Sequence, residues 1–338
     1  MKKNRFKTVF FSFFILAVIL AVISMSTGSY EISWDRVVRT LLGQGSHLEN
    51  ITIFRIRLPR IFIALVVAVA LSTAGAVLQG VSRNDLADPG ILGINAGASF
   101  AVVLFIGMGS SEYYDDLGTL SVFALPFVAI LGALAAAFLI YLLAWKNGIK
   151  PVRLILMGVA VNSGLVAAIT FYQMNFKQQD FNRVLVWTSG SLWGSSWKYF
   201  IAVTPIVLIF LTLTVRKYKH LDILMLGEDI ATGLGLDVGK EYRKLLIYTV
   251  ALAGSATAVA GSIGFLGLIS PHIARKLTGP RHARLIPVSA VISVCIVLFA
   301  DTLSRNLFAP VEIPVGITIA LIGVPYFIYL MLKGESNT

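Results

Sequence analysis

Apolar runs of about 20 residues recur from one end of this chain to the other, and a helix needs that length to cross the hydrocarbon core of a membrane. Of the 338 residues, 57% are hydrophobic and 13% are charged, whereas a soluble domain averages about a quarter charged residues. The sequence therefore predicts an all-α, polytopic membrane protein with one domain over residues 1–338. Ten membrane spans fit, at residues 8–28, 60–81, 91–108, 119–145, 152–174, 198–215, 245–262, 264–278, 286–305 and 315–333.

The first apolar run could be mistaken for a secretory signal peptide. Its core extends from Val9 to Met25, longer than the roughly 7–15 residues of a signal-peptide core, and no cleavage motif follows closely. We therefore expect an uncleaved first span, and ten spans place both termini on one side of the membrane. Cytoplasmic loops carry an excess of Lys and Arg, and cytoplasmic termini put most of the 28 basic residues on that side.

Several function classes find no support in the residues. The net charge of +11 follows from membrane topology, so it gives no reason to expect nucleic-acid binding. The single cysteine, Cys295, excludes an internal disulfide, and the four histidines are too scattered for a metal site. No Walker A motif exists, because Leu234 stands where the nearest match needs its first Gly. We expect no catalytic residue, no cofactor and no metal.

The chain also lacks convincing acids for ion coupling, which usually places carboxylates or histidines in the middle of the membrane. Most acids lie near span ends or in loops, and Asp301 comes closest to an intramembrane acid. Arg305 follows it by one helical turn, so a pair on the helix surface accounts for Asp301.

The cytoplasmic segment 216–244 is polar, although it connects two apolar spans. Gly227, Gly233 and Gly235 divide it, and the residues between them favour short helices joined by a Gly turn. Short helices in such a loop form a rigid projection that can dock into a groove on a soluble partner. From composition alone, an ordinary solvated loop is an equally good interpretation.

Three blocks of sequence are distinctive: residues 57–98, which include RLPR and RNDLADPG; residues 261–290, GSIGFLGLISPHIARKLTGPRHARLIPVSA; and residues 300–331, ADTLSRNLFAPVEIPVGITIALIGVPYFIYLM. In order and spacing they resemble the permease subunits of the ABC importers for iron-siderophores and vitamin B12. The segment 216–244 is similar to the coupling helices of that family. Asp85 is a departure, because the family commonly reads Asn-Pro-Leu-Ala where this chain reads NDLA.

The resemblance implies a ten-helix permease in which spans 2–5 and 7–10 form inverted repeats. Two such subunits, identical or paralogous, would pair around a central pathway. A cytoplasmic ABC ATPase dimer would bind on one side, and an extracytoplasmic substrate-binding protein on the other. The chain would be a multi-pass protein of the bacterial cytoplasmic membrane, surrounded by lipid bilayer. The implied cargo is a ferric siderophore, with haem or cobalamin as the alternative.

The resemblance also assigns residues to the docking of the binding protein. Arg57 and Arg60 at the head of span 2, and Arg305 at the outer end of span 9, match family arginines that pair with carboxylates on that protein. An exposed guanidinium suits this role, because it binds carboxylate through two parallel hydrogen bonds. The other interpretation is that these arginines anchor span ends at the membrane interface.

Two further groups are assigned on the cytoplasmic side. Asn84 and Leu86 match positions that narrow the pathway, and we expect Pro89 and Gly90 to break the helix there and leave a loop that can move. A cytoplasmic turn without a gating role is the alternative. The matches to the ATPase-coupling segment are Gly227, Glu228, Ala231 and Gly235.

Two other functions remain open from the residues. An ion-coupled secondary transporter would need buried acids that titrate, which the sequence hardly offers. A membrane anchor for a cytoplasmic enzyme would leave the matched arginines unexplained.

Overall fold

The computed structural model describes residues 3–28, 30–90, 93–108, 118–144, 151–309 and 311–335. Within these residues all regular structure is helical, and no strand occurs. Each of the ten predicted spans coincides with one helix. These helices are α1 (Lys3–Ser26), α4 (Leu58–Ser82), α5 (Ile94–Met108), α7 (Gly118–Ala144), α8 (Pro151–Gln173), α10 (Trp197–Arg216), α13 (Val238–Ala260), α14 (Leu266–Thr278), α15 (His282–Asn306) and α16 (Val315–Glu335).

Shorter helices lie between them: α2 (Trp34–Leu41), α3 (His47–Asn50), the π-helical η1 (Ile51–Arg57), α9 (Gln178–Thr188), α11 (Tyr218–Leu224) and α12 (Glu228–Gly233). A capping box starts α3, because the Ser46 hydroxyl accepts from the Glu49 N–H and the Glu49 carboxylate accepts from the Ser46 N–H. From there α3, η1 and α4 run on as one helical stretch of 36 residues.

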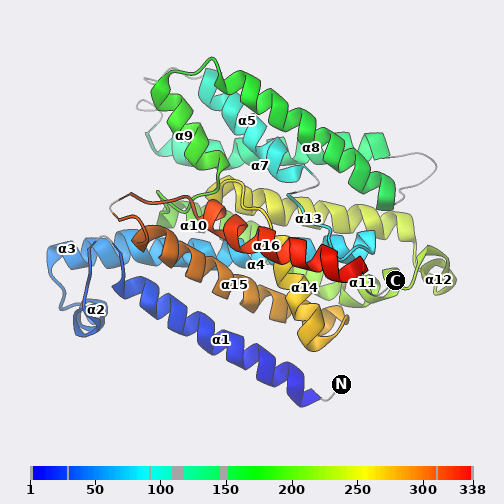
Figure 1. The fold of residues 1–338 in the computed structure, drawn as a ribbon, viewed down its shortest axis with the longest axis horizontal. Coiled ribbons are helices and arrows are strands. Elements are labelled where there is room, and N and C mark those ends of the chain that lie inside the picture. The colour runs from blue at the N-terminus through cyan, green and yellow to red at the C-terminus, as the bar shows by residue number, and fades with distance from the viewer. Residues whose placement is uncertain are drawn as a thin grey trace.

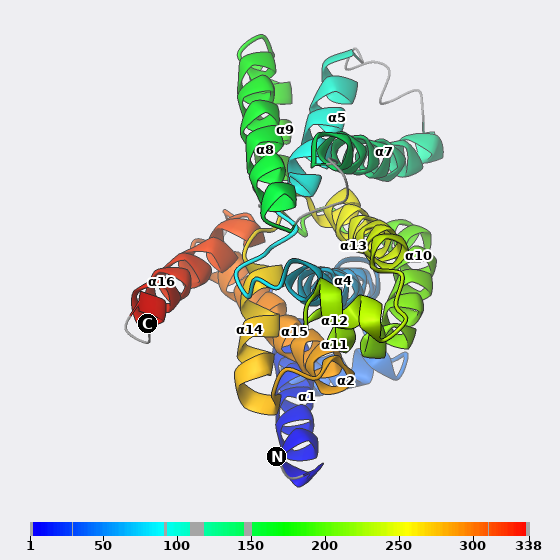
Figure 2. The same ribbon diagram turned by 90° about the vertical axis from the view of Figure 1, so that its right-hand side faces the viewer.

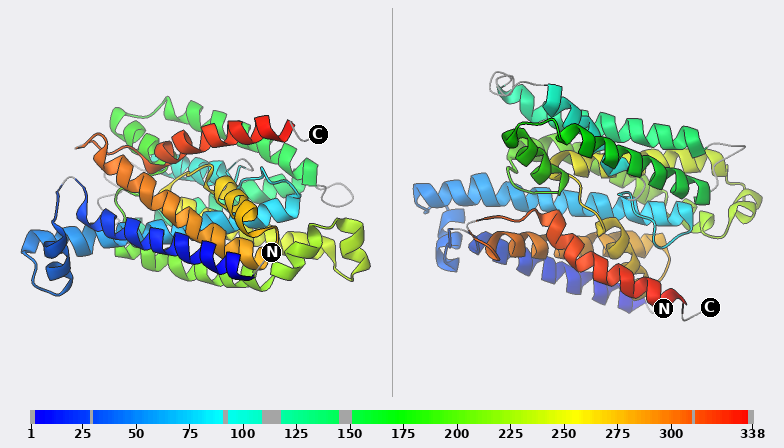
Figure 3. Two further views of the ribbon diagram at one scale, coloured as in Figure 1. Left: turned by 60° about the horizontal axis from the view of Figure 1, so that its bottom comes forward. Right: turned by 45° about the horizontal axis from the view of Figure 1, so that its top comes forward.

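The long helices lie side by side along the longest axis of the molecule (Figure 1). The α2 and α3 helices lie at one end, which we call the α3 end. The α11 and α12 helices project at the other, which we call the α12 end. Both termini of the described chain lie toward the α12 end, as the views in Figure 3 also show.

At the centre of the bundle is α4, which contacts α10, α13, α14 and α15 (Figure 2). Nearly all of its residues from Val67 to Ser82 are buried, and many are small. Gly75 is required where α4 crosses α14, since a Cβ there would overlap the carbonyl oxygen of Gly267. A second group, made of α5, α7, α8 and α9, packs beside α13 (Figure 2).

Six helical stretches are long and apolar enough to cross a membrane, and they contain α1, α4, α7, α8, α10 and α15. The α5 helix and the first fifteen residues of α16 are shorter apolar helices. Large apolar side chains such as Phe11, Phe138 and Leu321 are exposed on their outer faces. In a protein that crosses a bilayer, such faces contact lipid.

The helix before the cytoplasmic turn ends earlier than expected. Arg83 takes a left-handed conformation (φ 52°, ψ 33°), so α4 stops at Ser82. The prediction that Pro89 and Gly90 break this helix is therefore wrong, because the backbone has left the helix several residues before them.

Candidate functional site

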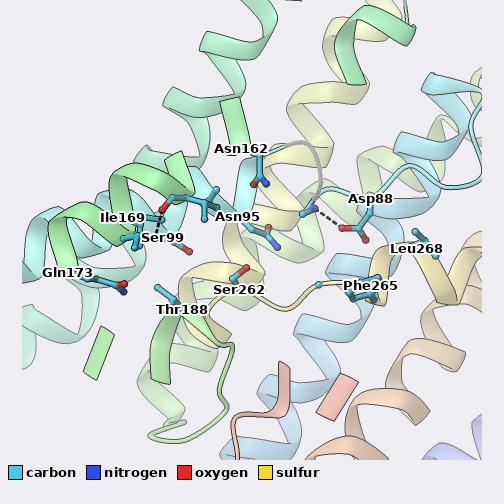
Figure 4. A pocket seen from close by; sticks show the side chains of 15 residues that line it. Asp88, Asn95, Ser99, Asn162, Ile169, Gln173, Thr188, Ser262, Phe265 and Leu268 are labelled. Atoms are coloured by element: carbon cyan, nitrogen blue, oxygen red, sulfur yellow. Dashed lines mark hydrogen bonds between the residues drawn. The ribbon is translucent and has the colours of Figure 1, made fainter. Parts of the chain in front are cut away.

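A cavity of ≈460 Å³ lies between α5, α8 and the residues that precede α14 (Figure 4). Its size is typical of a small-molecule site. Its polar lining residues are Asp88, Asn95, Ser99, Asn162, Thr170, Gln173, Thr188 and Ser262. Apart from the Asp88 carboxylate these groups are amides and hydroxyls, and none of the described residues that line the cavity is Lys, Arg or His.

Non-helical residues 261–265 form one wall of this cavity. The α13 helix ends at Ala260 because Gly261 takes φ 66°, where a Cβ would overlap the carbonyl oxygen of Trp187. Phe265 also takes a left-handed conformation (φ 65°), which is uncommon outside glycine. Irregular backbone at membrane depth is tolerated where it lines a cavity, so this break fits a polar path through the protein.

Asn95 of α5 holds that wall in place. Its side chain is buried, donates a hydrogen bond to the Ile263 carbonyl (3.4 Å) and accepts one from the Thr257 hydroxyl (3.0 Å). One amide therefore joins α5, α13 and the wall. Asn95, Asn162 and Gln173 were not predicted as site residues from the sequence, although an amide in an otherwise apolar span is a recognisable signal.

The gate turn, residues 83–90, connects α4 to α5 and borders the cavity at Asp88. The Asn84 side chain accepts from the Leu86 N–H (2.9 Å), and the Asn84 carbonyl accepts from the Ala87 N–H (3.1 Å). This is the hydrogen bonding of an Asx turn. Leu86 packs against the apolar cluster at the start of α14. Of the two predicted gate residues, Leu86 therefore packs on the cluster of Leu268, which lines the cavity, whereas Asn84 is not among the lining residues.

Arg60 is buried at the α3 end between two acids. Its guanidinium lies 2.8 Å from Asp301 Oδ1 and 2.8 Å from Glu312 Oε2. Arg305 Nε lies 3.3 Å from the other oxygen of Asp301, one turn along α15. The predicted pair of Asp301 with Arg305 is confirmed, and Arg60 is a second cation on the same carboxylate.

The three predicted docking arginines are not exposed. Arg57, Arg60 and Arg305 are 4%, 7% and 5% exposed. The chain between α1 and α2 covers Arg57, which donates to the carbonyls of Met25, Ser26 and Tyr30. The expectation of free guanidinium groups is therefore wrong, because backbone carbonyls and the acids of the α3 end already satisfy them. Among the nearby arginines, Arg36, Arg39 and Arg55 are exposed, and Arg36 is paired with Glu49 (2.6 Å).

The coupling segment, residues 216–244, forms the predicted projection of short helices. Gly227 (φ 113°) and Gly235 (φ 82°) flank α12 in conformations that glycine adopts without strain. Ala231 is fully buried against the rest of the chain. The prediction of short helices joined by Gly turns is confirmed.

Three large apolar side chains of this projection are exposed, and we call them the apolar stripe. Leu226, Ile230 and Leu234 follow one another at a spacing of four residues and are 57%, 53% and 62% exposed. The exposure of these side chains was not predicted from the sequence. Only Ile230 lies within α12, and the positive φ of Gly227 interrupts the helix between Leu226 and Ile230. Exposed apolar side chains on a polar loop indicate a surface that another protein covers.

The coupling segment is fastened to two long helices. Asp222 of α11 accepts from the His282 N–H (2.8 Å) and lies 2.7 Å from its Nδ1. Partial burial disfavours the carboxylate, but these hydrogen bonds outweigh it and lower the pKa of Asp222 below its ordinary value of 3.8. Glu241 of α13 pairs with Lys217 and His220, each at 2.9 Å. Displacement of the segment would therefore be transmitted to α13 and α15.

The gate turn and the coupling segment also touch, which the sequence did not predict. Arg83 Nη2 lies 3.7 Å from Glu228 Oε1. The predicted gate and coupling residues thus come together at the α12 end, while the three arginines lie at the α3 end.

The sequence model of the FecCD transport family matches residues 16–333. The iron(3+)-hydroxamate import system permease protein FhuG of Bacillus subtilis (strain 168) is 50% identical over 324 residues, which cover 95% of this chain and 96% of FhuG. The iron-uptake system permease protein FeuC of the same organism is 38% identical over 327 residues, which cover 96% of this chain and 97% of FeuC.

A solved structure described as an inward-facing, metal-chelate type ABC transporter shares the fold. The TM-score is 0.84 at 30% sequence identity, and the match covers 97% of this chain and 99% of the other. The likeness therefore extends over nearly the whole length of both chains.

Proposed function

Because the chain belongs to the FecCD transport family, we propose that it carries a ferric siderophore across the membrane as the permease subunit of an ATP-driven ABC importer. The chain is a multi-pass, non-catalytic subunit of the cytoplasmic membrane, and ATP is hydrolysed by a partner ATPase. The family also implies a substrate-binding protein as a partner.

The polar lining of the cavity supports a ferric hydroxamate as the cargo, because it is uncharged apart from the Asp88 carboxylate, and this observation carries the proposal. Each hydroxamate group bears a single negative charge, so three of them neutralise Fe³⁺. A strongly anionic chelate would approach the Asp88 carboxylate, while no cation stands among the described residues of the lining. FhuG, at 50% identity, carries iron(3+)-hydroxamate import in its name.

In the topology that we propose, ten helices cross the membrane, with α4, α5, α7 and α8 related to α13–α16 as inverted repeats. The α12 end lies in the cytoplasm together with both termini, and the α3 end lies outside. The excess of basic residues on the side of the termini supports this orientation.

The α12 projection is proposed to couple the permease to the ATPase. Its apolar stripe, Leu226, Ile230 and Leu234, would fill a groove on that subunit. Ala231 would hold α12 on the permease, Glu228 would join it to the gate turn, and Gly227 and Gly235 would set its angle. When ATP binding moves the ATPases, α12 would carry the motion to α13 and α15.

The cytoplasmic end of the path is proposed to be gated by Asn84 and Leu86. The Asx turn gives the gate a defined shape, and the packing of Leu86 on α14 lets helix movement displace it. Cargo would then leave the cavity toward the cytoplasm.

For the binding protein we propose a docking surface in which buried and exposed arginines have different roles. Arg57, Arg60 and Arg305 would hold the α3 end in one shape, as their internal partners indicate. The exposed Arg39 and Arg55 would meet carboxylates of the binding protein directly and speed the encounter.

The assembly would contain a second permease subunit, identical or paralogous, and an ATPase dimer. Residues 1–338 would act as one permease domain, with residues 216–244 as its coupling loop.

Uptake by the full complex in proteoliposomes tests the proposed function. With ATP on the ATPase side, we expect uptake of a ferric tris-hydroxamate to exceed that of a ferric tris-catecholate and to persist when the pH gradient is collapsed. Uptake that runs on the gradient without ATP would instead establish an ion-coupled transporter.

A further inference from the structure

The gate turn has an ion pair on the side of α14. Asp85 is the second residue of the turn that begins at Asn84, a position where β-turns favour proline. Its carboxylate lies 2.9 Å from Arg275 Nη1. The ion pair with Arg275 therefore restrains the gate turn, which lacks a proline ring to stiffen it.

Arg275 is itself held in place by α4. Its Nη2 donates to the Gln79 side chain (3.1 Å), and the Gln79 amide donates to the carbonyls of Gly267 (3.4 Å) and Leu268 (3.2 Å). The Arg275 side chain is 12% exposed. Its guanidinium is thus oriented toward Asp85 by contacts that do not involve the turn.

On its other side the gate turn reaches the coupling segment. Arg83, in its left-handed conformation, places Nη2 3.7 Å from Glu228 Oε1, and the Tyr242 hydroxyl donates to the same oxygen (3.4 Å). A Cβ on Gly227 would lie 3.6 Å from Arg83 Nη1, so the guanidinium sits directly over the start of α12.

Both ion pairs are partly exposed. The Asp85 side chain is 46% exposed, and those of Arg83 and Glu228 are 37% and 42% exposed. Partly exposed pairs are weak enough to break and re-form within a transport cycle, unlike a buried pair.

We propose that Arg83 and Asp85 are positioning residues that tie the gate turn to α12 and to α14, so that displacement of α12 relative to α14 moves the turn and opens the cavity. The proposal rests on the proposed function, because it takes Asn84 and Leu86 as the gate. Since the two tied residues are only two positions apart, a change in the separation of α12 and α14 must tilt the turn or break one of the two pairs. The tilt of the gate turn then follows the motion that the ATPase gives to α12.

The test uses the assembled complex and a reporter thiol in the gate. Leu86→Cys is introduced together with Cys295→Ala, which removes the buried native thiol. Reaction with a membrane-impermeant maleimide from the α12 side is followed without ATP and with ATP plus vanadate. Without ATP, Asp85→Arg and Arg275→Asp should each speed labelling by about two- to five-fold, the range expected for a partly exposed pair. The combined swap should return the wild-type rate.

The coupling pair is tested by the change in labelling on adding ATP and vanadate. Arg83→Glu should reduce this change, and Arg83→Glu with Glu228→Arg should restore it. An effect of Arg83→Glu that does not depend on the ion pair would not be rescued by exchanging the two charges. Swaps that fail to restore labelling would overturn the proposal.

Two further variants separate the ion pair from general effects. Asp85→Asn and Asp85→Pro both remove the charge, and both should speed labelling, although proline suits the turn. Lys276→Asp makes a similar charge change next to Arg275, at an exposed residue without an ion pair in the described chain, and should leave labelling unchanged.

Suppose that Asp85→Asn and Asp85→Pro label at the wild-type rate in a complex that imports ferric hydroxamate with ATP. This result would refute the tie between the gate turn and α14 without refuting the proposed function. A wild-type complex that imports no ferric hydroxamate would instead refute the proposed function.

Discussion

At the α3 end, Arg60, Asp301 and Arg305 are 7%, 1% and 5% exposed, whereas at the α12 end the paired side chains of Arg83 and Glu228 are 37% and 42% exposed. The first set shares one buried carboxylate. The second touches across 3.7 Å at the surface. These two sets of charges are therefore held with very different strength.

The difference follows from the cost of removing charges from water. A buried pair is hard to separate, because each charge left alone is strongly destabilised. A surface pair contributes about 0–1 kcal/mol and exchanges readily with water. The network of Arg60, Asp301 and Arg305 is thus suited to a fixed platform, and the pair of Arg83 with Glu228 is suited to a contact that breaks and re-forms. The following predictions test this contrast.

The largest effect should come from Asp301→Asn. Arg60 and Arg305 would lose the carboxylate between them, and breaking a buried pair costs about 3–5 kcal/mol. Thermal unfolding of the purified protein should show a large fall in the midpoint. Glu312→Gln is the matched control, because Glu312 is 27% exposed and Arg60 keeps Asp301. Equal midpoints for the two variants would contradict the buried network.

Protein of this Asp301→Asn variant that remains folded should still import cargo with ATP and ignore the pH gradient. If the wild type imported cargo on the pH gradient without ATP, and Asp301→Asn lost this uptake, Asp301 would be shown to relay protons.

A smaller effect is expected for Gly235→Leu at the α12 end. Its φ of 82° costs a non-glycine residue about 1–2 kcal/mol, so α12 and its apolar stripe should shift. Uptake should fall about ten-fold, and the ATPase should bind less tightly. The variant chain should still insert into the membrane. Gly233→Leu is the control, because Gly233 lacks a left-handed φ and a Cβ there meets no described atom within 4 Å. Equal uptake in both variants would argue against α12 as the coupling element.

The exposed arginines of the α3 end should have a kinetic effect. Arg39→Glu combined with Arg55→Glu should slow association of the binding protein by about two- to five-fold at low salt, and high salt should remove the difference. Association rates measured over a salt series check this. Lys276→Glu at the α12 end should leave the rates unchanged. If the association rates of wild type and the double variant stay equal at low salt, the binding protein docks without these arginines.

The smallest effect concerns Asp222. Its pKa is lower in the folded protein than its ordinary 3.8, so its stabilising contribution is full above that value and is lost as the pH falls through the folded pKa. The side chain is 33% exposed, so the contribution should stay below about 1 kcal/mol. The unfolding midpoints of wild type and Asp222→Asn should differ at neutral pH and converge below pH 3.8. A constant difference across this range would exclude the linkage.

The helices themselves could be predicted well, because an apolar run of sufficient length forms a helix in a membrane whatever lies around it. The Gly-divided coupling segment could also be predicted, since Gly227 and Gly235 mark turns by their local chemistry. The burial of Arg60 could not be predicted, because its partner Asp301 lies 241 residues away in the sequence. The same limit applies to Asp85, whose restraint comes from Arg275 on α14.

The sequence by itself determined a helical membrane protein, the positions of ten helices and the projection at residues 216–244, because each of these depends on the composition of a short stretch of chain. The tertiary structure decided which charges are buried, which amides line the cavity and which side of the gate turn each ion pair holds. Those features depend on how α4, α14 and α15 pack, and packing brings together residues whose separation in the sequence carries no information about their distance in space.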